Sequence, residues 1–217
     1  NEIIAATGGG LFQLINNEYK TYTSVDGLET VDISCLALDH LGNTWIGGSS
    51  PVGILQIYNR NTIESVAIFD FNLTAIIDIQ IIDSLAWVSF LNGQDPGIMK
   101  FRYDTEWKYI DSYRNFPQES GGFTNFIAND SLLILGTNNG IYYGKISNNL
   151  KDPNNWETID EDLSFSITDI YQSESKIIFS SSSAIYNLDI NSLTWSEIVN
   201  SGPRTYNDIS KIIISDQ

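Results

Sequence analysis

Short apolar runs separated by polar turn residues follow one another along the whole chain. A tight turn followed by two apolar residues recurs five times, at intervals of 43 or 44 positions. The first residues of these five copies are Gly10, Gly53, Gly97, Gly140 and Ala184. A fixed period of this length is the sequence signature of a repeat architecture.

Each period contains four strand-like runs, which we name a to d in chain order. In the second unit they are ISCLALD (33–39), TWIGG (44–48), GILQIY (53–58) and SVAIF (65–69). This pattern predicts an all-β fold of the β-propeller type, with one blade of four antiparallel strands per unit. A β-sandwich also has short strands and frequent turns, but it does not require a matching position in every period. Trp107, Trp156 and Trp195 recur at the start of the d runs, which indicates a packing role.

The two ends of the chain complement each other. The chain begins with a b-type run at 3–7 and ends with an a-type run, ISKIIIS, at 209–215. An open strand edge is a liability, and pairing 212–215 with 3–6 would remove it. We therefore expect one β-propeller domain over residues 1–217, with five blades closed by this pairing. The alternative is a fragment of a ring of about six to eight blades. Because the chain starts at Asn1 without a methionine, we expect a processed chain or a domain excised from a larger protein.

Composition and charge narrow the range of partners. Hydrophobic residues make up 42% of the chain, which is enough for a buried core, and the net charge is −16. Such an acidic surface repels phosphate groups, so nucleic acid and anionic membranes are poor partners. No run approaches the ~18 apolar residues of a membrane span. The single cysteine, Cys35, lies in an apolar run and is expected to be a small buried hydrophobe.

The second unit resembles a known repeat family. DHLGNTWIGG at 39–48, followed by GILQIYN at 53–59, is similar to the two-component-regulator propeller repeat, and ILGTNNGIYYG at 134–144 resembles its later half. The resemblance implies a bacterial ligand-binding or secretion-associated propeller that is periplasmic, cell-surface or secreted, and it brings no catalytic motif. The other units depart from the pattern: Ala184 replaces the turn glycine, and the tryptophan of the b run recurs only as Trp45 and Trp87.

By analogy with other propellers, the site is expected on the face that carries the d–a and b–c loops. An Asp or Asn recurs at the start of every a run, at Asp32, Asp78, Asn125, Asp169 and Asp208. These oxygens could form a ring that holds Ca²⁺, water or sugar hydroxyls. The reading that we favour is structural, with Asx side chains supporting each loop or bonding to the next blade. Loop residues Tyr113, Phe116, Arg204 and Tyr206 are the further candidates for stacking on a sugar or contacting a protein.

Three classes of function remain open at this point. We favour a monomeric, non-catalytic module that binds a glycan, a small ligand or a protein, with no cofactor except an optional Ca²⁺. The second class is a glycoside hydrolase or a lyase-like enzyme. A glycoside hydrolase would need two carboxylates about 5–9.5 Å apart, which the a-run carboxylates could supply. The sole histidine, His40, has no convincing partner for a nucleophilic triad. The third class is a scaffold within a larger secreted or sensor protein.

Overall fold

The computed structural model describes residues 2–68, 72–173, 176–200 and 209. Within these ranges the chain forms β-strands and three short 3₁₀ helices, η1 (Ser24–Asp26), η2 (Gln118–Ser120) and η3 (Pro153–Asn155). In this part of the chain no helix has the length and apolar character that crossing a bilayer requires. The chain divides into two compact units, Asn1–Arg114 and Asn115–Gln217, which we call unit 1 and unit 2.

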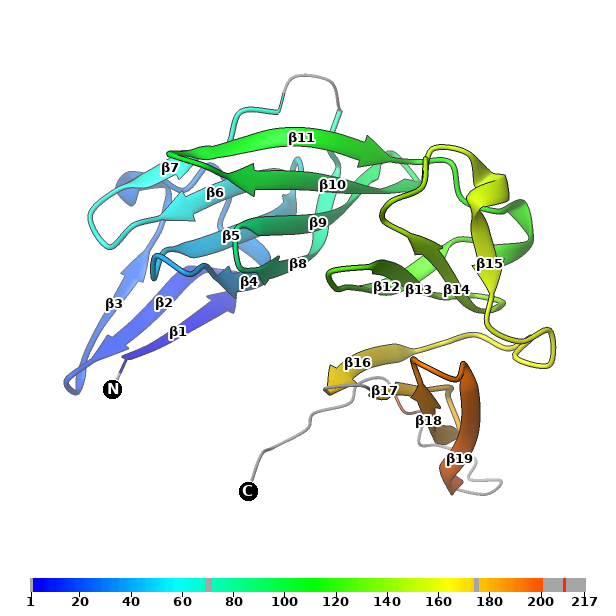
Figure 1. Ribbon diagram of the computed structural model, residues 1–217. Coiled ribbons are helices and arrows are strands. Elements are labelled where there is room, and N and C mark those ends of the chain that lie inside the picture. The colour runs from blue at the N-terminus through cyan, green and yellow to red at the C-terminus, as the bar shows by residue number, and fades with distance from the viewer. Residues whose placement is uncertain (1, 69–71, 174–175, 201–208, 210–217) are drawn as a thin grey trace. The chain divides into compact units, whose positions relative to one another are not determined.

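Unit 1 contains three antiparallel sheets (Figure 1). Sheet A consists of β1 (Glu2–Thr7), β2 (Gly10–Ile15) and β3 (Glu18–Tyr22). Sheet B consists of β4 (Asp32–Leu38), β5 (Thr44–Ser50), β6 (Ile54–Tyr58) and β7 (Ile63–Ser65). Sheet C consists of β8 (Ala75–Ile82), β9 (Leu85–Asn92), β10 (Asp95–Tyr103) and β11 (Trp107–Tyr113).

Unit 2 contains two sheets of four antiparallel strands each. Sheet D consists of β12 (Phe123–Ala128), β13 (Leu132–Thr137), β14 (Gly140–Lys145) and β15 (Trp156–Thr158). Sheet E consists of β16 (Asp169–Ser173), β17 (Lys176–Ser180), β18 (Ala184–Asp189) and β19 (Thr194–Asn200).

The strands of every sheet follow one another in chain order, and sheets B to E each contain the four strands a to d. The prediction of an all-β, propeller-like succession of antiparallel sheets is therefore confirmed. Within the described ranges sheet A contains strands b, c and d, with β1 at its edge. The predicted closing pairing of 212–215 with 3–6 involves residues outside the described ranges.

One strand lies earlier than the sequence pattern predicts. The d strand of sheet B is β7, Ile63–Ser65, and not SVAIF at 65–69. The reason is the turn before it: Oδ1 of Asn59 accepts hydrogen bonds from the backbone N–H groups of Asn61 at 3.1 Å and Thr62 at 2.9 Å. Because this Asx turn reverses the chain at once, Ile63 already pairs with Tyr58.

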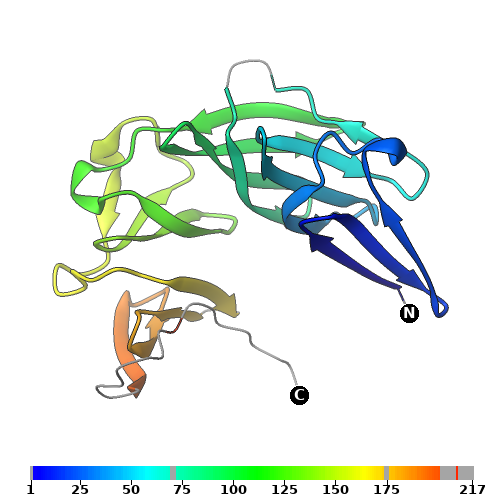
Figure 2. The same ribbon diagram turned by 180° about the vertical axis from the view of Figure 1, so that it is seen from behind.

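The hydrophobic cores lie between neighbouring sheets within each unit. Sheets A and B share a cluster that includes Leu11, Ile33 and Ile46, and sheets B and C share a cluster around Trp45, Ile76 and Phe101. In unit 2, residues of sheets D and E share a third cluster. Figure 1 and Figure 2 show sheets B and C beside each other from opposite sides. Each sheet therefore buries its apolar side chains against the next sheet, as blades do.

The repeated turn glycine has a steric explanation. Gly10 and Gly140 adopt positive φ angles of 118° and 89°, a conformation that costs an L-residue energy but not glycine. A Cβ atom at these positions would also collide with the backbone oxygens of Tyr22 and Leu163, respectively. At these two positions the repeated glycine marks the place where the start of strand c meets the backbone at or after the end of strand d.

Candidate functional site

The b–c turns and the d–a loops lie together in each unit, as predicted, and we call their shared surface the loop face. In unit 1 the backbone N–H of Gly53 donates to the carbonyl of Leu73 over 2.9 Å. In unit 2 the N–H of Gly140 donates to the carbonyl of Phe165 over the same distance. Each bond joins the turn between strands b and c to the loop that leads to the next sheet.

Side-chain amides strengthen this connection in unit 2. Nδ2 of Asn138 donates to the carbonyl of Gly121 over 2.7 Å, and Nδ2 of Asn139 donates to the carbonyl of Glu119 over 3.0 Å. Both asparagines belong to the turn between β13 and β14, and both residues are exposed. The loop face of unit 2 is therefore fixed by hydrogen bonds and still presents polar groups to solvent.

The strand register defines which a-strand residues are equivalent. In sheets B, C and D the shared position follows a bulge in strand a. In all four sheets it pairs with the equivalent residue of strand b. The pairs are Cys35 with Gly47, Asp78 with Ser89, Asn125 with Gly136 and Asp169 with Ser180. The expected equivalence of Asp32 is therefore wrong: two register shifts in β4 move this residue ahead of the shared position, where it lies opposite Ser50.

The predicted oxygen-bearing side chains make local contacts. Oδ2 of Asp32 accepts a bond from Oγ of Ser49 at 3.0 Å, and Oδ2 of Asp78 accepts one from Nε2 of Gln80 at 3.2 Å. Oδ1 of Asp169 accepts the N–H of Ile170, the next residue, at 3.0 Å. Within the described ranges, no group of three or more His, Cys, Asp or Glu side chains is arranged to hold a metal ion.

Asn125 has a different role, because it reaches the neighbouring sheet. Its Nδ2 donates to the carbonyl of Thr168 over 3.1 Å, at the entry to β16. This is the kind of inter-blade bond that the structural interpretation of the repeated Asx residues expects. Asp208 lies outside the described residues.

Hydroxyl groups one residue earlier make a similar connection in both units. Oγ of Ser34 and Oγ1 of Thr124 each lie within hydrogen-bond distance of a carbonyl of strand b and a carbonyl of the next sheet or its approach loop. The distances are 3.0 Å to Gly47 and 2.7 Å to Ile76 for Ser34, and 2.9 Å to Gly136 and 2.8 Å to Ile167 for Thr124. A hydroxyl has one proton, so it donates to one of its two carbonyls at a time.

The predicted loop aromatics are packed against other rings. Tyr113 is buried and stacks on Trp87, with the ring centroids 6.0 Å apart. Phe116 is half-buried and contacts Phe123 and Trp156 edge to face, at centroid distances of 5.1 and 5.4 Å. These rings support the loops, and whether they also bind a ligand stays a prediction. The other two candidates, Arg204 and Tyr206, lie outside the described residues.

The thiol of Cys35 is the group that takes the shared position in sheet B. Burial raises its pKa to about 12, and the nearby charge of Asp78 adds to the rise. The thiol therefore stays protonated at neutral pH, which makes it a poor nucleophile. Cys35 packs against the core cluster shared by sheets B and C, but the residue is half-buried and not fully buried as expected.

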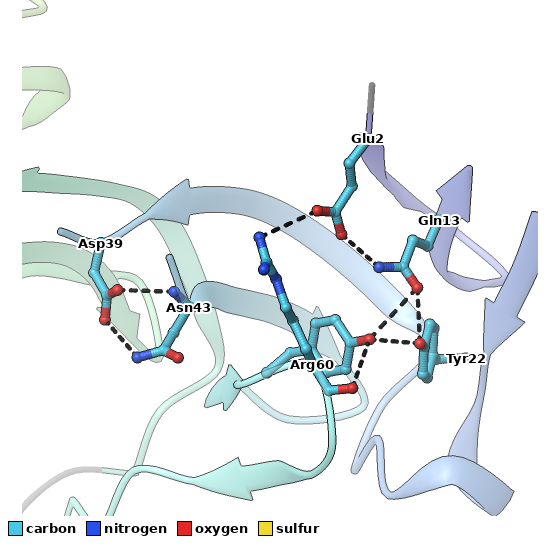
Figure 3. Close-up of polar contacts among 7 residues, drawn as sticks. Glu2, Gln13, Tyr22, Asp39, Asn43 and Arg60 are labelled. Atoms are coloured by element: carbon cyan, nitrogen blue, oxygen red, sulfur yellow. Dashed lines mark hydrogen bonds and ion pairs between the residues drawn. The ribbon is translucent and has the colours of Figure 1, made fainter. Parts of the chain in front are cut away.

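Asp39 forms a polar centre that sequence reasoning did not single out as a site. Its buried carboxylate accepts a hydrogen bond from the backbone N–H of Leu41 at 2.9 Å. It also accepts the backbone N–H of Asn43 at 2.9 Å and Nδ2 of Asn43 at 3.1 Å (Figure 3). It also accepts the indole N–H groups of Trp45 at 3.4 Å and Trp107 at 3.0 Å. The Asp-x-x-Gly-Asn-x-Trp signal thus describes a turn that is organised around one carboxylate.

The pKa of Asp39 reflects this environment. Burial acts to raise it, but the hydrogen bonds from Asn43, Trp107 and Leu41 outweigh burial, and the pKa lies below its ordinary value. Hydrogen bonds also lower the pKa of Asp160, from the N–H of Asp162 and then the indole of Trp195. These two carboxylates are ionised at neutral pH, so neither has the raised pKa of a general acid.

A second polar network joins sheets A and B (Figure 3). The hydroxyls of Tyr22 and Tyr58 lie 2.5 Å apart, and Oε1 of Gln13 accepts a bond from Tyr22 at 2.8 Å. Oε1 of Glu2 accepts Nε2 of Gln13 at 2.6 Å, and Oε2 of Glu2 is 3.3 Å from a guanidinium nitrogen of Arg60. Burial, followed by the bond with Tyr22, raises the pKa of Tyr58 to about 12. The network is therefore neutral in its buried part and charged only at its exposed end.

Beside this network lies a cleft of about 410 Å³, which we call the edge cleft. It is lined by Glu2 and Ile4 of β1, by residues 36–38 of β4 and by Arg60. β1 is the edge strand of sheet A, and its Ile3 side chain is 56% exposed. Because Glu2 and Ile4 are alternate residues of β1, the cleft lies on one face of this strand, toward β4, and Ile3 points to the other face.

A larger cleft, of about 610 Å³, lies elsewhere in unit 1, and we call it the outer cleft. One wall is residues 64–68, which include the end of β7, and the other is the start of β11, residues 106–109. Leu41 and Asn43 of the β4–β5 turn and Tyr103 at the end of β10 also line it. Because a–b turns and c–d connections form this part of its lining, the outer cleft does not belong to the loop face. The sequence contained no signal for it, since its walls meet only after sheets B and C pack.

Known proteins were compared with the chain at three levels. Neither a protein-family model nor a curated protein matches the sequence. Among solved structures, PorZ, a surface component of the type-IX secretion system of Porphyromonas gingivalis, is 16% identical with a TM-score of 0.70, over 92% of this chain and 27% of that one. The extracellular domain of the putative one-component system BT4673 from Bacteroides thetaiotaomicron is 14% identical with a TM-score of 0.66, over 90% and 26%.

An enzyme is also among the similar structures. Virginiamycin B lyase from Staphylococcus aureus is 13% identical with a TM-score of 0.65, over 93% of this chain and 67% of the lyase. The chain spans about a quarter of the length of the first two proteins. At these identities the likeness shows a shared fold and does not extend to activity or ligand.

Proposed function

We propose that the chain is a non-catalytic binding module of an extracytoplasmic bacterial protein, and that it recognises a carbohydrate through its loop face. The observation that carries the proposal is that hydrogen bonds join b–c turns to d–a loops. Gly53 bonds to Leu73 in unit 1, and Gly140 bonds to Phe165 in unit 2. A surface that is fixed before binding loses little conformational entropy when a ligand arrives.

The chemistry of the loop face in unit 1 suits a sugar. Val25 in η1 is 92% exposed, and Val52 in the turn between β5 and β6 is 52% exposed. Asp32 and Ser49 lie at the start of β4 and near the end of β5, where their oxygens can bond to hydroxyl groups. A sugar ring offers both a C–H face for apolar side chains and hydroxyls for polar ones, and a neutral sugar is not repelled by a net charge of −16.

The similar structures support the proposed location. PorZ is described as a bacterial surface component and the BT4673 domain as extracellular. The resemblance of residues 39–59 to the two-component-regulator propeller repeat points the same way. Sensing for a signalling partner, or recognition within a secretion system, would each fit a binding module.

We also propose that the five sheets close into one ring through the C-terminal run at 209–215. The position of β1 at the edge of sheet A among the described residues supports this, because a further strand paired with β1 would give sheet A the four strands that sheets B to E have.

A thermal-shift screen of the 217-residue chain tests the binding function. The probes are neutral bacterial and algal oligosaccharides, each with Ca²⁺ and with a chelator. A sugar that binds only the folded state stabilises it by about 2.7 kcal/mol at a hundred times its dissociation constant. The shift should disappear in Val52→Asp and persist in Ile198→Asp, a control whose side chain on β19 is 53% exposed. No shift with any sugar, or equal shifts in both variants, would overturn the proposal.

A further inference from the structure

The outer cleft is distinct from the loop face, and the elements that form its walls indicate what could occupy it. Successive side chains of a strand point to opposite faces of the sheet. Trp107, Lys108 and Tyr109 are consecutive residues of β11, and all three line the cleft. A cleft that touches consecutive residues must run along the backbone edge of the strand, not along one face of the sheet.

Among the described residues, no strand pairs with β11 on the side away from β10. It is the outermost strand of sheet C and pairs with β10 (Figure 1). The opposite wall is also extended backbone: Val66, Ala67 and Ile68 are consecutive and all line the cleft. The N–H of Val66 donates to the carbonyl of Leu55 over 2.9 Å, which continues the pairing beyond the last residue of β7. The cleft thus runs between two stretches of polypeptide backbone.

The lining of the cleft combines aliphatic, aromatic and charged side chains. Tyr103, Trp107 and Tyr109 supply rings, and Trp107 is held in place by the bond from its indole N–H to Asp39. The indole ring of Trp107 therefore forms a flat surface that does not have to reorganise when a ligand binds.

The charges of the outer cleft favour a basic ligand. Glu64 lines one wall and Glu106 the other, and Lys108 lies 3.4 Å from Glu106, with both side chains largely exposed. The two carboxylates outnumber the single lysine, and the whole chain carries a net charge of −16. Opposite charge on a partner would speed association and orient it.

We infer that the outer cleft receives an extended segment of a partner protein, in which basic residues alternate with apolar ones, as an added strand on β11. Backbone hydrogen bonds to the open edge would supply affinity, and the alternating side chains would supply specificity. The basic residues would meet Glu64 and Glu106, and the apolar residues would meet the rings of Trp107 and Tyr109. The outer cleft is separate from the loop face, so a negative result for one proposal does not decide the other.

The test uses a fluorescein-labelled seven-residue peptide of alternating lysine and valine. One control peptide has glutamate in place of lysine. A second keeps the lysines but carries N-methyl groups on alternate amides, which removes backbone donors without changing charge. Fluorescence anisotropy should show at least tenfold tighter binding of the lysine peptide than of either control. Hydrogen–deuterium exchange should slow for the amides of β11.

Protein variants complete the experiment. Glu64→Lys/Glu106→Lys should weaken binding at least tenfold, whereas Glu18→Lys/Glu161→Lys, the same charge change at exposed sites outside the cleft, should weaken it no more than twofold. The inference is overturned if the lysine peptide does not bind, if the N-methylated peptide binds equally well, or if both double variants behave alike. It is also overturned if an oligosaccharide shifts the Trp107 indole resonance while no peptide protects β11, because the cleft would then be a sugar site.

Discussion

The indole N–H of Trp107 donates a hydrogen bond to Oδ2 of Asp39 over 3.0 Å. The bond joins the turn between β4 and β5 to the first residue of β11, and so links sheet B to sheet C. The same carboxylate oxygen also accepts the indole of Trp45 at 3.4 Å. One buried side chain therefore organises its own turn, fixes a core ring of its own sheet and anchors the outer strand of the next.

Replacing Asp39 with alanine should destabilise unit 1 strongly. Two indole N–H groups and two backbone N–H groups would lose their acceptor, and unpaired buried donors are costly. We expect a loss of roughly 3 kcal/mol in the free energy of unfolding, which urea denaturation would measure. Asp130→Ala, at an exposed position in the corresponding turn of sheet D, should change it by less than about 0.5 kcal/mol. Equal effects of the two substitutions would contradict the role of Asp39.

The same carboxylate predicts a pH dependence. The pKa of Asp39 is lower in the folded state than its ordinary value, so the unfolded chain takes up a proton at a higher pH than the folded chain does. The stabilisation is therefore complete above the unfolded pKa of about 3.9 and is lost as the pH falls through the lower, folded pKa. Urea denaturation from pH 7 to pH 3 should show wild type and Asp39→Asn converging toward the acid end. A constant difference across this range would show that ionisation of Asp39 is irrelevant to stability.

Two buried tryptophans at equivalent strand positions should respond differently to the same change. Trp45 donates its indole N–H to Asp39, whereas the buried Nε1 of Trp87 has no hydrogen-bond partner among the residues that the structure describes. Both substitutions by phenylalanine remove similar volume, but only Trp45→Phe removes a bond, while Trp87→Phe removes an unsatisfied donor. Trp45→Phe should therefore cost about 1 kcal/mol more. The reverse order in chemical denaturation would contradict the assigned environments.

Closure of the ring can be tested by truncation. A chain that ends at residue 208 lacks the run proposed to pair with β1, and its melting temperature should fall sharply because the edge of β1 stays open. A chain with the run kept and Lys211 changed to Ser is the matched control and should melt near wild type. An unchanged melting temperature in the truncated chain would rule out closure by this segment.

The repeat period was readable from the sequence because glycine is required wherever strand c starts against a backbone oxygen, as at Gly10 and Gly140. The strand order followed from the same period. The sequence pattern made Asp32 equivalent to Asp78, because apolar and polar positions alone do not reveal the two register shifts in β4. For β7, the pattern followed the apolar run 65–69 and overlooked the Asx turn at Asn59.

The polar centres were harder to predict than the strands. The bond between Asp39 and Trp107 spans 68 positions, and its two partners meet only when sheets B and C pack. The DxxGNxW signal located the turn without revealing that its carboxylate also holds the next sheet. The outer cleft is likewise a product of packing, since residues 64–68 and 106–109 are neighbours only in the folded chain.

The central claim is that the chain binds carbohydrate through its loop face, and saturation-transfer difference NMR tests it most directly. The oligosaccharide mixtures are recorded with wild type, with Val52→Asp and with the control Ile198→Asp. We predict transfer from wild type and from the control, and loss of transfer in Val52→Asp at an unchanged melting temperature. Absence of transfer from wild type for every sugar, or equal transfer from all three proteins, would contradict the claim.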